Sequence, residues 1–160
     1  MNHIISVLVE NKSGVLAKIS GLFSRRGFNI ESLAVGPTED DKISRITLVV
    51  SAEEHSIEQV IKQLYKLINV IKIQELNPSN IVERELVLIK VSTDSKIRAE
   101  ILEIVNIFRA NIVDVSKKSL LIEITGTESK ISALEELLRP YGILELIRTG
   151  KIACARGSKS

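Results

Sequence analysis

The chain has very little cysteine and few aromatic residues. Its 160 residues include one cysteine, no tryptophan, two tyrosines and three phenylalanines. The single thiol, Cys154, excludes a disulfide within the chain and any cysteine-rich metal site, which suits a reducing compartment. So few aromatic rings also leave no stacking platform of the kind that proteins use to bind single-stranded nucleic acid.

An excess of one charge and a long apolar run are lacking too. With 22 basic and 20 acidic residues the net charge is +2, too weak a field to indicate nucleic acid or an anionic membrane as a partner. No apolar run reaches the roughly 18 residues of a membrane-spanning helix, and the N-terminus lacks the three regions of a signal peptide. We therefore expect a soluble globular protein whose mature form starts near Met1.

The residue types that carry catalysis are scattered. His3 and His55 lie far apart, and neither has a cysteine or a carboxylate at metal-ligand spacing. The acidic pairs Glu53-Glu54 and Glu135-Glu136 fall where helix starts and exposed helix faces usually carry charge, and no nucleophile motif is present. We expect no catalytic residue and no metal site.

Apolar periodicity predicts a strand, helix, strand, strand, helix, strand order in the first half. Residues 3 to 9 are apolar on both alternating faces, as in a central strand that is covered on two sides. In the last strand, Ile71 and Ile73 are expected to point inward. The predicted elements are a strand at 3–9, a helix from Val15 capped by Gly27, a hairpin of strands at 29–37 and 43–51, a helix over 57–68 and a strand at 69–76.

The same order repeats after a cluster of turn-forming residues, Asn77 to Asn80. The second set comprises strands at 83–92, 111–116, 119–125 and 143–149 and helices over 97–108 and 131–138. The prediction is an α+β protein of two ferredoxin-like βαββαβ sandwiches. Its domains are residues 1–76 and 83–160, joined by a linker at 77–82.

This fold bears on assembly. Both helices of a βαββαβ unit cover one sheet face, so the other face needs cover. Because the first strand is apolar on both sides, a lone unit exposes an apolar patch. We expect a dimer or a larger assembly.

The loop from Glu10 to Gly14 suits a ligand. It leads into a helix, whose first backbone N–H groups are free to bind a small anion such as a carboxylate. Gly14 allows close approach, and the carboxamides of Asn11 and Asn29, at either end of the helix, can hold the charged groups of an amino acid.

Val15, Leu16 and Ile30 would then form the apolar wall of the site. A purely structural explanation fits the same residues, because Asn11 and Ser13 can cap the helix and Asn29 can start a strand. Spacing alone supports both hypotheses equally.

A family resemblance is carried by most of the chain. The stretch VLVENKSGVLAKISGLFSRRGFNIESLAVGPTEDDKISRITLVV resembles the ACT domain that begins the small, regulatory subunit of acetolactate synthase (acetohydroxyacid synthase). VERELVLIKV, IFRANIVDVS and ITGTESKISALEELLRPYGILELIRTGKIACARG are similar to the C-terminal domain of that family.

The resemblance implies a regulatory subunit with no synthase activity of its own. Such a subunit binds and activates the large catalytic subunit, and it confers feedback inhibition by valine on the synthesis of valine, leucine and isoleucine. The cofactors, thiamine diphosphate, Mg and FAD, are expected on the catalytic subunit and none on this chain. The expected location is the bacterial cytoplasm, or the plastid stroma for a plastid-encoded chain.

The resemblance also places the valine site. It favours the ligand hypothesis for the residues that spacing alone left undecided. It implies that Asn11, Gly14, Val15 and Leu16 of one ACT domain bind valine together with Asn29 and Ile30 of its partner in a homodimer. The alternative is a free-standing ACT-type amino-acid sensor that acts on another enzyme or on transcription. The match in the C-terminal half and the lack of a helix-turn-helix argue against it.

Overall fold

The computed structural model describes residues 2–157. They form two compact units, each described separately below. The N-unit contains the chain up to Val82 and again from Lys151 onward, and the C-unit contains Glu83–Gly150. The chain therefore passes from the N-unit to the C-unit and back.

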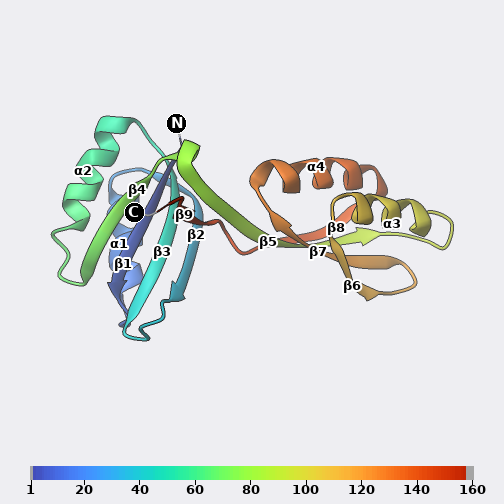
Figure 1. Cartoon of the computed structure of the whole chain (residues 1–160), viewed down its shortest axis with the longest axis horizontal. Coiled ribbons are helices and arrows are strands. Elements are labelled where there is room, and N and C mark those ends of the chain that lie inside the picture. Colours follow the sequence, from blue (N-terminus) through green and yellow to red (C-terminus); the bar gives the residue numbers. More distant parts are fainter. Residues whose placement is uncertain (1, 158–160) are drawn as a thin grey trace. The chain divides into compact units, whose positions relative to one another are not determined.

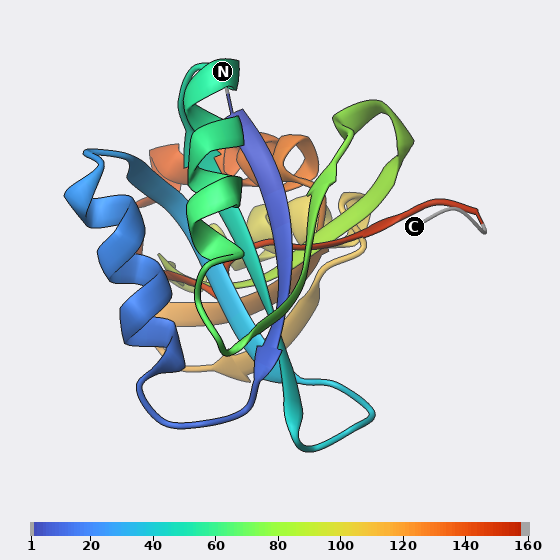
Figure 2. The ribbon, with the colours of Figure 1, turned by 90° about the vertical axis from the view of Figure 1, so that its left-hand side faces the viewer.

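The N-unit has the predicted βαββαβ order, and its four-stranded sheet has the strand order β2-β3-β1-β4. Both helices lie on one face of the sheet (Figures 1 and 2). The elements are β1 (Asn2–Glu10), α1 (Val15–Arg25), β2 (Asn29–Pro37), β3 (Ile43–Ser51), α2 (Glu54–Leu64) and β4 (Val70–Leu76).

The main core of the N-unit lies between this sheet and its helices. Alternate residues of the central strand, Ile5, Val7 and Val9, are buried against the apolar faces of α1 and α2. Phe23 of α1 is fully buried, and its ring meets that of Phe28 edge-on at 6.2 Å between centroids. The 3.6-residue spacing of α1 and the two-residue spacing of β1 thus converge on one core.

The opposite, outer face of the N-unit sheet is covered in part by the chain itself. Ile4, Val49 and Leu76 form a second buried cluster with Ala153, which lies on β9 (Ile152–Ala155). Directly before this strand, the Lys151 N–H donates a hydrogen bond to Ser32 Oγ at 2.8 Å. The sequence pattern predicts an uncovered face here, and it gives no sign of β9.

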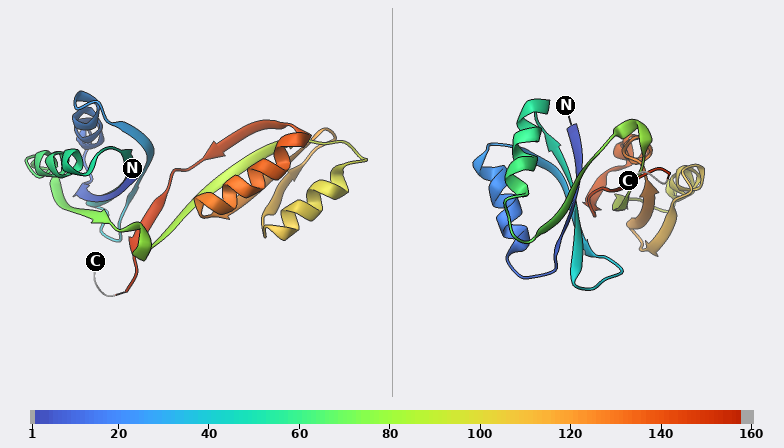
Figure 3. Two further views of the ribbon diagram at one scale, coloured as in Figure 1. Left: turned by 90° about the horizontal axis from the view of Figure 1, so that it is seen from above. Right: turned by 60° about the vertical axis from the view of Figure 1, so that its left-hand side comes forward.

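The C-unit repeats the architecture with the equivalent order β6-β7-β5-β8. Its helices again share one face of the sheet (Figure 3) and enclose a separate core around Ile89, Ile122 and Leu134. After the short helix η1 (Pro78–Asn80), which still belongs to the N-unit, the elements are β5 (Ile81–Ser92, which begins in the N-unit), α3 (Arg98–Ile107), β6 (Asn111–Val115), β7 (Ser119–Gly126), α4 (Glu128–Leu138), η2 (Arg139–Tyr141) and β8 (Ile143–Arg148).

Two local predictions were wrong. Ile71 is 49% exposed, because the pairing of β1 with β4 shifts between Leu8 and Val9 and leaves Ile71 out of register. The second helix ends at Leu64, so Ile68 lies beyond it and is 89% exposed. The described residues from Lys151 onward pack with the N-unit, and the predicted domain bounds, 1–76 and 83–160, stay a prediction.

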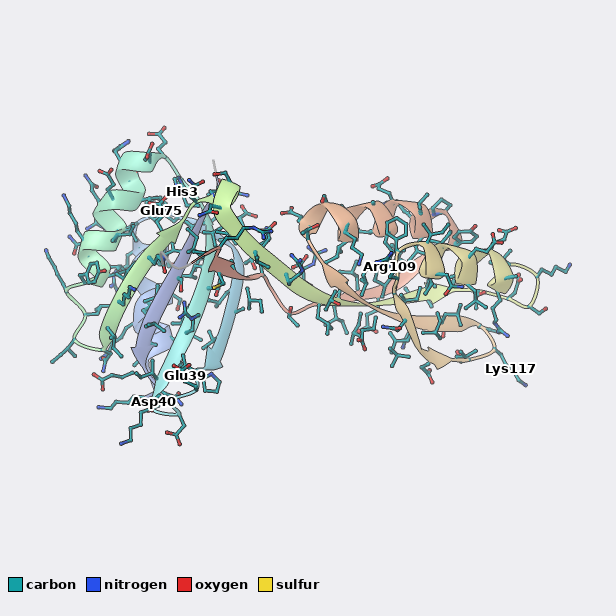
Figure 4. The ribbon with its side chains drawn as sticks, viewed as in Figure 1. His3, Glu39, Asp40, Glu75, Arg109 and Lys117 are labelled. Atoms are coloured by element: carbon teal, nitrogen blue, oxygen red, sulfur yellow. The ribbon has the colours of Figure 1, made fainter. Side chains whose placement is uncertain are left out.

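Neither histidine contributes to a site. His3 is buried, and its ring nitrogens lie 2.7 Å from Glu75 Oε1 and 3.1 Å from the Ala52 carbonyl oxygen, so it joins β1 to the end of β4 (Figure 4). His55 is exposed beside Glu53. Within the described chain, no helix has the length and apolar character needed to cross a membrane.

The position of β9 predicts the effect of a charge at Ala153. We expect Ala153→Glu to lower the free energy of unfolding by about 2–4 kcal/mol, because it forces a larger, charged side chain against Ile4 and Leu76. Ile152→Glu is the matched control and should change it by less than about 0.5 kcal/mol, because Ile152 is 59% exposed. Urea unfolding measures both, and equal losses would show that β9 does not seal this face.

Candidate functional site

The candidate site begins at the start of α1. Gly14 is the N-cap residue with φ +85°, a left-handed conformation that glycine adopts without strain. No side chain caps this helix, so the capping explanation for Asn11 and Ser13 does not hold. The first N–H groups of α1 are therefore free of side-chain partners and carry the partial positive charge of a helix start.

The turn between β2 and β3 lies beside the loop that leads into α1. The Asn11 N–H donates to the Lys42 carbonyl at 2.7 Å, and Asn11 Nδ2 donates to the Asp41 carbonyl at 2.9 Å. These bonds hold the loop against the turn and leave the carboxamide oxygen of Asn11 available. The loop and the turn together line a shallow hollow. Its lining residues are Glu10, Asn11, Lys12, Asp40, Asp41, Lys42 and Ile43.

The contribution of this turn was not predicted from the sequence. Residues 38 to 42 have the pattern of solvated turn residues, yet Asp40 and Asp41 line the hollow. Figure 4 shows Glu39 and Asp40 at this end of the N-unit, away from His3 and Glu75. The pairing of β1 with β3, in which Glu10 lies opposite Ile43, brings the turn to Asn11, so no local pattern could have revealed it.

Lys12 is the cation nearest in sequence to the helix start, and it is already paired. Its Nζ lies 2.8 Å from Glu10 Oε2. The hydrogen bond and the charge of Glu10 raise the pKa of Lys12 above its usual value. A ligand carboxylate at this end would therefore meet backbone N–H groups more than a free ammonium group.

The second group of predicted residues lies at the other end of α1. After the C-cap residue Arg26, Gly27 has φ +74° and turns the chain into β2. Asn29 starts that strand, and its Nδ2 donates to Glu31 Oε1 at 2.9 Å. A second shallow hollow is lined by Ser20, Ser24, Gly27, Phe28, Asn29 and Ile30.

The two groups do not meet within one chain. They are separated by α1, whose 11 residues span about 16 Å at 1.5 Å per residue. Asn11 and Gly14 lie at one end, and Asn29 and Ile30 lie at the other. A ligand the size of an amino acid cannot touch both groups of a single chain.

The predicted apolar wall is only partly available. Leu16 is 39% exposed at the start of α1, and Ile30 packs half-buried at the edge of the core. Val15 is 4% exposed and belongs to the core, so within the single chain its side chain is not open to a ligand. The helix period explains this, because Val15 shares a face with Ile19 and Leu22.

The described residues offer no clustered metal-binding side chains. Among them, no three or more His, Cys, Asp or Glu side chains gather closely enough to hold a metal ion. Cys154, the lone thiol, is exposed on β9. What the N-unit presents is backbone N–H groups, carboxamides and acidic turn residues, which suit binding of a small charged molecule.

Comparison with known proteins finds relatives over nearly the whole chain. Residues 5–72 match the family model described as an AHAS small subunit-like ACT domain, and residues 84–157 match that of the small subunit of acetolactate synthase. The chain is 60% identical to a probable acetolactate synthase small subunit of Archaeoglobus fulgidus over 99% of both chains. It is 57% identical to the acetolactate synthase small subunit of Mycolicibacterium smegmatis, over 98% of this chain and 92% of that one.

A solved structure is similar throughout. The crystal structure of the acetolactate synthase small subunit from Thermotoga maritima superposes with a TM-score of 0.92, at 44% identity and over 99% of each chain. Both family models, the relatives and this structure point the same way, and they confirm the resemblance and the fold predicted from the sequence. The chain belongs to the family of acetolactate synthase small subunits.

Proposed function

We propose that this chain is a non-catalytic regulatory subunit that binds and activates the large catalytic subunit of acetolactate synthase and confers feedback inhibition by valine. Membership of the small-subunit family supports the partner. The observation that carries the regulatory part is the uncapped start of α1 beside Asn11, which offers backbone donors to a carboxylate. Thiamine diphosphate, the metal and FAD are assigned to the catalytic subunit.

The separation of the two half-sites supports a valine site shared between two copies. β2 is an edge strand of the N-unit sheet, so its outer edge presents unpaired N–H and C=O groups. If two copies pair through this edge about a two-fold axis, β2 and α1 of one copy run opposite to those of the other. The start of one α1 then faces the end of its counterpart, and Asn11 and Gly14 approach Asn29 and Ile30 of the second copy.

Each part of valine then has a partner of suitable chemistry. The carboxylate is bound by the first N–H groups of α1, where the space beside Gly14 is open: a Cβ added at this residue would meet no atom within 4 Å. The ammonium group is bound by carboxamide oxygens of Asn11 and Asn29. Leu16 of one copy and Ile30 of the other contact the isopropyl group.

A shared site gives a physical route to regulation. Valine that bridges two N-units stabilises one arrangement of their interface over another, and the surface offered to the catalytic subunit changes with it. A coupling free energy of about 1–3 kcal/mol is typical of such effects and is sufficient here, provided that valine binds one arrangement that much better.

The partner is tested by affinity capture from a lysate of the source organism. We expect the tagged chain to retain a thiamine diphosphate-dependent synthase, and the purified pair to be more active than the catalytic subunit alone. Valine should inhibit the pair and not the catalytic subunit. Capture of a transcription factor or of an unrelated enzyme, with no synthase, would instead favour a free-standing amino-acid sensor.

Gly14→Asp tests the start of α1. A carboxylate side chain at this position repels the carboxylate of valine, so we expect inhibition to be lost while activation without valine persists. Gly14→Asn is the matched control, because asparagine has nearly the same shape, tolerates a left-handed conformation and is neutral. It should weaken valine binding less than Gly14→Asp, and a Gly14→Asp complex that stays fully sensitive to valine would show that the site lies elsewhere.

Mixing two defective chains tests whether the site is shared. Gly14→Asp and Asn29→Ala chains should each bind valine poorly. In a mixed dimer, however, one of the two shared sites combines the intact Gly14 of one chain with the intact Asn29 of the other. Calorimetry on the mixture, with dimer formation checked by sedimentation, should therefore recover valine binding. No recovery in a proven mixed dimer would mean that each site is built from one chain.

A further inference from the structure

A hollow of about 100 Å³ lies on the outer face of the N-unit sheet, away from both half-sites described above. That volume is enough for several water molecules or one small anion. Its lining comes from three sheet strands and from β9, all within the N-unit. The lining residues are Ser6, Leu8, Arg45, Lys72, Gln74, Leu76, Ala153, Cys154 and Ala155.

Strand register sets two cations on either side of the hollow. Leu8 of β1 pairs with Arg45 of β3 on one side and with Lys72 of β4 on the other. The three residues therefore share the outer face, with the two cationic positions roughly 10 Å apart, twice the spacing of neighbouring strands. Arg45 Nη1 donates to Ser6 Oγ at 2.6 Å, which directs the guanidinium group over β1 and toward the hollow.

These cations have no acidic partner in the part of the chain that the structure describes. Lys72 and Arg45 take part in none of its ion pairs, and no residue lining the hollow is acidic. Glu10, two residues beyond Leu8 on the same face of β1, pairs with Lys12 instead. One bond to Ser6 leaves most of the five N–H donors of Arg45 unused by this contact.

The rest of the lining suits a small polar guest. Ser6 is 3% exposed and places its hydroxyl group in the floor, with Gln74 beside it in the register of β4. On β9, Ala153 and Ala155 are the residues that face the sheet, and their small side chains leave the space open. Larger residues at these two positions would fill it.

We propose that this hollow binds a small oxyanion, a carboxylate or phosphate group, between Arg45 and Lys72. The guanidinium group contacts two oxygens of such a group, as its planar fork favours, and the ammonium group of Lys72 supplies the second charge. Ser6 and Gln74 complete the donors. The site is independent of the valine site and of its test, because it uses the opposite face of the sheet.

The direct test is a titration of the full chain with inorganic phosphate, and separately with acetate, at constant ionic strength, followed by backbone amide NMR shifts. We expect saturable shifts confined to residues 6–8, Gln74 and 153–155. The double variant Arg45→Gln/Lys72→Gln should bind about tenfold or more weakly. Lys62→Gln/Lys66→Gln on and after α2 removes the same charge elsewhere and should bind like the unaltered chain.

The two anions distinguish the ligand class. Tighter binding of phosphate supports a phosphate group held by both cations, and tighter binding of acetate supports a carboxylate on Arg45. Shifts that do not saturate, that spread over exposed cations in general, or that persist unchanged in the Arg45→Gln/Lys72→Gln variant would overturn the proposal.

Cys154 provides an independent readout, because it lines the hollow and is the only cysteine of the chain. A doubly anionic aromatic disulfide reagent should modify this thiol faster than a neutral pyridyl disulfide does, after correction for their rates with a free thiol. Phosphate or acetate, whichever binds, should slow modification of the unaltered chain and not of the double variant. Equal rates and no protection would contradict an anion site here.

Discussion

Burial of β1 on both faces is the constraint on which the N-unit depends. One set of alternate residues packs against α1 and α2, while Ile4, in the other set, packs against β9. Because a strand has a period of two residues, a slip of one position would exchange these sets and place Ser6 in the main core. The register of β3 and β4 on β1 is thereby fixed. The same register fixes the positions of the turn that contacts Asn11 and of the two cations that flank Leu8.

The proposed binding of small charged molecules needs no catalytic cluster in this architecture. An uncapped helix start and the turn beside it supply donors and acceptors largely from backbone, so little at this end depends on the identity of a reactive side chain. On the outer face the reverse holds, because the side chains of Arg45 and Lys72 create the chemistry and the strands only space them. On these two proposals, one sheet carries two kinds of recognition on its two sides.

Much of this fold is predictable from local patterns. The apolar spacing of residues 15–23 and Gly27 predict α1 and its end, and the alternation in 43–51 predicts β3. What failed depends on partners distant in sequence. Ile71 leaves the core because of a register shift against β1. On β9 the residues that face the sheet, Ala153 and Ala155, are small, and their role emerges only when Ile4 and Val49 lie beneath them. The residues of the candidate site were predicted through the family resemblance. Spacing alone supported a ligand site and a structural role equally.

The return of the chain to its first unit has a consequence for biosynthesis. β9 leaves the ribosome only after the whole C-unit has been made, since Lys151 follows Gly150 at the boundary. Until then the newly made N-unit sheet has Ile4, Val49 and Leu76 without their final cover, and its completion depends on contacts between residues about 150 positions apart. An N-unit that still lacks β9 exposes this apolar face and is open to association with another nascent copy. Assembly and completion of the fold can therefore be linked in time.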